Sequence, residues 1–95
     1  MKKYYAASLI YHGVLGGGLI ADEESLTYKT GKVTVDWKFR NLQMKYEDMA
    51  SAQSRWVFIF PILTVFMKTG ESYRFLVFAP GKIKKLLENH QITVR

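Results

Sequence analysis

Two histidines have the side-chain chemistry most suited to catalysis or metal binding. His12 stands beside Gly13 near one end of the 95-residue chain, and His90 closes a helical pattern near the other end. We interpret His12 as a turn residue and His90 as a helix-end residue that interacts with the last carbonyls. The sequence contains no nucleophile elbow, phosphate-binding loop, paired-histidine helix or calcium loop. We therefore expect the protein not to be an enzyme and to use neither a cofactor nor a metal.

Two further short segments have residue types that can bind ions. The acidic run 22–24 offers carboxylates to a hard cation but lacks the spaced oxygen ligands of a dedicated site, so we interpret it as a solvated turn. The three glycines at 16–18 can present N–H groups to an anion, but without a following helix or lysine a sharp chain reversal is favoured. Cysteine is absent, which excludes disulfides and thiolate sites and fits a cytoplasmic location.

The formal net charge of +6 indicates either an anionic partner or a surface charge that only keeps the protein soluble. Lys82, Lys84 and Lys85 fall in the first turns of a predicted helix, where the helix dipole disfavours cations. One interpretation is that they bind an anion or the headgroup of an anionic lipid. The alternative is a solvated helix face on which Lys84 and Glu88 pair at i,i+4. The other basic residues are scattered among acids without an aromatic base-stacking motif, which argues against nucleic acid.

The apolar run 56–67 is the most informative segment for binding. It is too short to span a bilayer, and Pro61 divides it because proline cannot donate to a sheet ladder. A barrel strand is normally polar on its outer face, whereas alternation here places apolar residues on both faces, with Trp56, Phe58 and Phe60 together on one. The alternatives are a central strand covered on both faces and a surface for self-association or a protein partner. The predicted interface residues are Arg55, Trp56, Phe58, Phe60, Pro61 and Ile62.

The elements that must position these residues are mostly short strands in a single domain, 1–95. Val33–Phe39 alternates most strictly, and 47–51 reads as a turn or one helical turn. The helix is expected at about 80–90, with Pro80 at its first position and an apolar stripe toward the core. Many short antiparallel strands must hide their edges, which predicts a partly open barrel of two packed sheets capped by the helix. We expect about seven strands from the eight strand-like segments, which lie at 4–11, 19–21, 26–29, 33–39, 42–46, 56–60, 62–67 and 71–78.

This order of elements resembles the pleckstrin-homology-like superfold, especially its GRAM-type and bacterial members. The resemblance spans about residues 15 to 89 and rests on three segments. They are Gly18–Asp22 with Leu26–Tyr28, Met44–Ser51, and Leu63–Val65 with Gly70–Phe75. It implies a mainly β fold with one C-terminal helix and a non-catalytic binding module for proteins, peptides or phosphoinositide headgroups. The segment 12–18 has at most one ionisable group, whereas lipid-binding members usually carry several basic residues there.

Two hypotheses of function follow from these patterns. The first is a binding module that acts through a protein partner or through self-association as a homo-oligomer. The second is a module that binds the anionic phospholipid surface of a membrane through the basic residues of the helix. We expect a cytoplasmic protein in the first case and one peripheral to the membrane in the second. The start of the chain has a positive end and an apolar run, but its histidine, tyrosines and glycines argue against a signal peptide.

Overall fold

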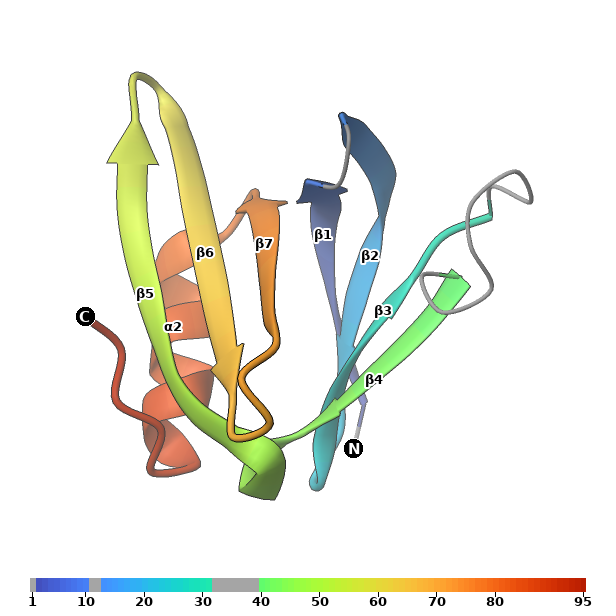
Figure 1. The fold of residues 1–95 in the computed structure, drawn as a ribbon. Coiled ribbons are helices and arrows are strands. Elements are labelled where there is room, and N and C mark those ends of the chain that lie inside the picture. Colours follow the sequence, from blue (N-terminus) through green and yellow to red (C-terminus); the bar gives the residue numbers. More distant parts are fainter. Residues whose placement is uncertain (1, 11–12, 32–39) are drawn as a thin grey trace.

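A computed structural model describes residues 2–10, 13–31 and 40–95 of the chain. In these residues seven antiparallel strands form one open sheet in the order β4-β3-β2-β1-β7-β6-β5 (Figure 1). The predicted mainly β fold with one C-terminal helix is confirmed. The strands are β1 Lys3–Ile10, β2 Val14–Ala21, β3 Ser25–Lys29, β4 Asn41–Lys45, β5 Met49–Val57, β6 Phe60–Met67 and β7 Ser72–Val77. A 3-10 turn, η1 (Tyr46–Asp48), joins β4 to β5, and the helix α2 (Pro80–Asn89) follows β7.

The sheet bends so that its inner face encloses one apolar core. Figure 1 shows β5, β6 and β7 as one wall and β1 to β4 as the other, with α2 alongside the first wall. Ile83 and Leu87 of α2 are fully buried, and they close the core between the two walls. The largest buried side chains that the sheet contributes to this core include Leu9, Leu19, Leu26, Tyr28, Met44, Leu63, Val65 and Phe75.

Alternation along β6 and β7 divides their side chains between two faces. Leu63 and Val65 of β6 are buried on the inner face, and Phe75 of β7 joins them. Ile62 and Leu76 lie opposite each other on the outer face and are only half-buried. Because α2 packs on the inner face, these strands are not covered on both sides. The alternative of a doubly covered central strand at 56–67 is therefore wrong.

Helix α2 begins at Pro80, as predicted, because proline tolerates the first helical position. After Gln91 the chain turns back and runs parallel to β5, with a bridge between Ala52 and Val94. The N–H of Ala52 donates to the Thr93 carbonyl at 2.9 Å, and the N–H of Arg95 donates to the Ala52 carbonyl at 3.0 Å. We call residues 92–95 the terminal strap. It pairs with the β5 edge, which would otherwise expose unpaired backbone groups.

Some of the predicted elements have other structures. The glycines at 16–18 lie inside β2 instead of forming a turn. A Cβ on Gly17 would overlap the carbonyl oxygen of Lys29, so close approach of β3, and not chain reversal, requires glycine there. Of the turn or helical turn predicted at 47–51, the first two residues lie in the 3-10 turn η1, whereas 49–51 already belong to β5. The predicted strand 33–39 and His12 lie outside the described residues.

Candidate functional site

The turn between β5 and β6 carries the most exposed apolar side chains described in the chain. Val57 pairs with Phe60, which leaves a two-residue turn of Phe58 and Ile59. Phe58 is 94% exposed and Ile59 is 78% exposed, while Trp56 beside them is 64% exposed. We call Trp56–Phe60 the apolar knob. Figure 1 shows this hairpin reaching beyond the neighbouring end of β7.

The backbone of the knob runs against local preference. Phe58 has φ of 56°, which lies in the left-handed region that bulky aromatic residues rarely adopt. Two-residue hairpin turns normally use asparagine, aspartate or glycine at such positions. Here the two turn residues are a phenylalanine and an isoleucine, and no other described residue covers their side chains. A sequence selected only for folding would be expected to place small polar residues at this turn.

A shallow groove of about 650 Å³ lies on the outer face of the sheet, next to the knob. We call it the outer groove. Its apolar residues come from five strands, and two of them, Val57 and Phe60, also belong to the knob. Arg55 and Arg74 are its exposed cationic members. The groove is lined by Ile10, Val14, Gln53, Arg55, Val57, Phe60, Ile62, Thr64, Phe66, Ser72, Arg74 and Leu76.

The six predicted interface residues all lie in the β5–β6 hairpin, but not on one face. Arg55 pairs with Ile62, and both line the outer groove. Trp56 pairs with Pro61 at the next position, which alternation places on the opposite face. The prediction that Trp56, Phe58 and Phe60 share a face is wrong, because Phe58 is in the turn. Sequence reasoning missed the groove residues Ile10, Val14 and Leu76, since they meet the hairpin only through the strand order.

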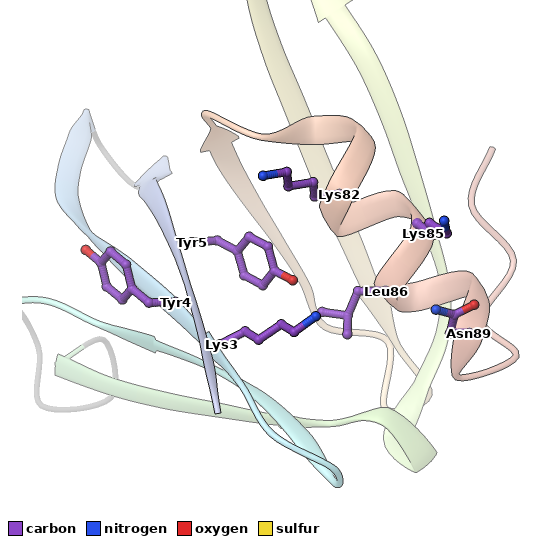
Figure 2. A pocket seen from close by; sticks show the side chains of 7 residues that line it. All are labelled: Lys3, Tyr4, Tyr5, Lys82, Lys85, Leu86 and Asn89. Atoms are coloured by element: carbon purple, nitrogen blue, oxygen red, sulfur yellow. The ribbon is translucent and has the colours of Figure 1, made fainter. Parts of the chain in front are cut away.

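A second, basic cavity of about 600 Å³ lies between α2 and the beginning of β1 (Figure 2). We call it the basic pocket. Lys82 and Lys85 enter it from α2, because a spacing of three places them on one stripe of the helix. Lys3 enters from β1, and Figure 2 shows the Tyr5 hydroxyl pointing toward α2 from the same strand. Its lining residues are Lys3, Tyr4, Tyr5, Lys82, Lys85, Leu86 and Asn89.

The structure divides the predicted lysine triad. Lys82 and Lys85 line the basic pocket, whereas Lys84 is exposed and does not line it. Lys3, which comes from the opposite end of the sequence, joins them instead. No local sequence signal links Lys3 to the helix, because β1 reaches α2 only through the folded sheet.

The acidic turn and His90 have structural roles. Asp22 Oδ1 accepts the N–H groups of Glu24 and Ser25, each at 2.8 Å, and these bonds lower the pKa of Asp22. The His90 ring stacks on Tyr46 with centroids 3.8 Å apart. Burial, with smaller contributions from the Asp22 charge and from Tyr5, raises the pKa of Tyr46 to about 12. Among residues 2–10, 13–31 and 40–95, no three potential metal ligands cluster.

Comparison with known proteins gives a fold but no family. No family model matches the chain, and no curated protein matches it. Several solved structures have a similar fold, and one of them serves as an example. It is the C-terminal domain of an unknown protein from Leishmania infantum, which matches with a TM-score of 0.76 and 10% identity over 93% of this chain and 80% of that one. At that identity the likeness concerns the fold alone.

No helix in the described part of the chain has both the length and the apolar character needed to cross a membrane. Helix α2 is ten residues long, about half of what a bilayer requires.

Proposed function

We propose that the protein is a non-catalytic binding module, of the pleckstrin-homology or GRAM-like type, that self-associates through its β5–β6 hairpin. The observation that carries the proposal is the apolar knob next to an apolar groove on the same chain. In the proposed dimer the knob of one copy occupies the outer groove of the other.

Exposure of the apolar side chains of the knob to water is unfavourable in free energy, and burial of these side chains against a partner would be favourable. Burying one large apolar side chain stabilises by about 1.5–3 kcal/mol. Phe58 and Ile59 are neighbours in the turn and Trp56 stands two positions before them, and each of the three is more than half exposed. Contiguous apolar patches on monomers seldom exceed a few hundred Å² unless they serve an interaction. Aromatic side chains are also enriched at the centres of protein interfaces.

A second copy of the chain fits this patch better than an unrelated surface. The knob is convex and the groove is concave, and both are mainly apolar. Because Val57 and Phe60 belong to both, a two-fold axis beside the hairpin would place each knob in the partner's groove. Arg55 and Arg74 are exposed and can remain hydrated at the edges of such a contact.

The proposal is tested by light scattering over a concentration series, with wild type and Phe58→Asp compared. We expect wild type to dimerise at roughly 10–100 μM and Phe58→Asp to weaken the dimer at least about tenfold, because a charge would enter an apolar contact. Phe58→Asp should unfold at the wild-type temperature, since the side chain is 94% exposed in the monomer.

The matched control is Phe78→Asp, which introduces the same charge at a phenylalanine that is 65% exposed and outside both surfaces. It should leave the dimer unchanged. A wild type that stays monomeric throughout, or equal weakening by both variants, would contradict self-association. Phe58-dependent binding of a monomeric protein to neutral phosphatidylcholine vesicles would also contradict it, and would instead favour insertion of the knob into a membrane.

A further inference from the structure

We propose that the outer groove also binds a small carboxylic acid with an unbranched apolar chain, and that this ligand competes with the knob of a second copy. The binding follows from the groove alone, whereas the competition rests on the proposed self-association. A ligand of this class would separate the two copies and so regulate the surface that joins them.

The end of the outer groove beside the hairpin turn is apolar. Ile62 of β6 lies directly opposite Leu76 of β7, and the next pair on this face toward the turn is Val57 with Phe60. Ile62 and Leu76 are half-buried, whereas Val57 and Phe60 are exposed. An apolar chain lying on these four side chains would remove its own surface and theirs from water, which is favourable in free energy.

The other end of the groove is crossed by a row of polar side chains from three strands. Gln53 of β5 pairs with Thr64 of β6, and Thr64 pairs with Arg74 of β7, so the three lie side by side on the outer face. All three can donate hydrogen bonds. This row stands two positions along the strands from Ile62 and Leu76, which is roughly 7 Å. A ligand with a polar head and an apolar chain therefore matches the groove along its length.

The charges of the groove favour an anionic head. Arg74 belongs to the polar row, and Arg55 lines the groove from β5, opposite Ile62. No carboxylate is among the described residues that line the groove, and neither arginine forms an ion pair with a described residue. A planar guanidinium can donate two parallel hydrogen bonds to one carboxylate. Because most of the remaining lining is apolar, one carboxylate on an apolar chain fits better than a ligand with many charges.

The groove has the size of a small-molecule site and overlaps the proposed dimer contact. Its volume of about 650 Å³ lies within the range that is typical of ligand pockets. Val57 and Phe60 belong both to the knob and to the apolar end of the groove. A chain bound at this end would occupy the space that the partner's knob takes in the proposed dimer, so the two exclude each other.

The test is isothermal titration calorimetry with decanoate, below the concentration at which it forms micelles, on wild type and on Phe58→Asn. Phe58 lies outside the groove, and asparagine removes the ring of the knob without adding a charge that would repel the ligand. At protein concentrations where wild type is mostly dimeric, Phe58→Asn should bind decanoate at least about threefold more tightly, because its groove is free. Light scattering should show decanoate lowering the mass of wild type toward that of the monomer.

Changes in the ligand and in the groove test the role of each end. Decanol lacks the charge and acetate lacks the chain, so both should bind at least about tenfold more weakly than decanoate. Arg74→Gln should weaken decanoate binding about tenfold, because a charge-assisted hydrogen bond is lost, and should leave decanol binding unchanged. The matched control is Lys45→Gln, which removes the same charge from β4 at the opposite edge of the sheet, and it should change the Kd by less than about twofold.

The outcomes separate this proposal from self-association. A wild type that dimerises while neither it nor Phe58→Asn binds decanoate would overturn the ligand and leave self-association intact. Equal decanoate binding by Phe58→Asn and a monomeric wild type would support the ligand and contradict the dimer, and with it the competition. Equal losses in Arg74→Gln and Lys45→Gln, or decanol binding as tight as that of decanoate, would overturn the assignment of the carboxylate to the groove.

Discussion

Both faces of β6 and β7 carry large apolar side chains, but the two faces have different surroundings. On the inner face Leu63, Val65 and Phe75 are at most 2% exposed beneath α2. On the outer face Ile62 and Leu76 are only half-buried and line an open groove. The apolar side chains of the inner face therefore stabilise the fold, whereas those of the outer face, in our proposal, bind a second copy of the chain. An apolar face that is covered by another layer, here α2, contributes to stability, and an apolar face without such a layer is available for binding.

The largest expected difference between the faces is at two neighbouring residues of β7. Phe75→Ala should lower the free energy of unfolding by about 3–5 kcal/mol, because it leaves a cavity in the core. Leu76→Ala, one position along and on the outer face, should cost less than about 1.5 kcal/mol in the monomer. Urea denaturation of dilute protein measures both. Similar losses for the two variants would mean that the outer face is as tightly packed as the inner one.

A second, smaller difference is expected at neighbouring glycines of β2. Gly17→Ala should destabilise by about 1–3 kcal/mol, because the new methyl group would overlap the backbone of Lys29. Gly16→Ala serves as the control, since nothing lies within 4 Å of a Cβ at that position and its change should stay within about 0.5 kcal/mol. Thermal unfolding of the two variants compares them, and a stable Gly17→Ala protein would contradict the close approach of β2 and β3.

The smallest expected effect is a pH dependence from the buried phenol of Tyr46. Its folded pKa is about 12 against the usual value of 10.0, so its stabilising contribution is complete below pH 10 and is lost as the pH rises toward 12. Near neutral pH, Tyr46→Phe should cost about 1 kcal/mol through loss of the hydrogen bond from the phenol to the Asp22 carbonyl.

That deficit should shrink above pH 10, because the phenylalanine variant has no phenol to ionise. The measurement is the free energy of unfolding as a function of pH for wild type and variant. Tyr4→Phe, which removes the phenol of a tyrosine that is 67% exposed, serves as the control variant. A deficit for Tyr46→Phe that is constant across the alkaline range would contradict the burial of this phenol.

Local patterns in the sequence were enough to predict the β fold and the C-terminal helix. Pro80 marks the start of α2, and Ile83 and Leu87 are four residues apart, as the helical period requires of residues on one face. Both Ile83 and Leu87 are buried in the structure. The turn at Phe58 and Ile59 could not be predicted in this way. Turn prediction depends on glycine, asparagine and aspartate, and this turn uses none of them.

The candidate surfaces were predicted only in part, because they combine distant segments. The hairpin residues from Arg55 to Ile62 were identified from their apolar character, and Lys82 and Lys85 from their place in the helix. Lys3, Tyr5 and Leu76 were missed, since β1 stands next to β7 in the sheet although the two are far apart in the sequence. Such a pairing depends on strand order, and no local periodicity encodes strand order.

The terminal strap has a consequence for handling the protein. It is attached to β5 through main-chain hydrogen bonds, including the 2.8 Å bond from the Ser54 N–H to the Arg95 carbonyl, and its Ile92 is buried in the core. Local opening of these few bonds would uncover the β5 edge at Ala52 and Ser54. Variants that lack residues 92–95 should therefore associate through their exposed β5 edges and form fibrous aggregates.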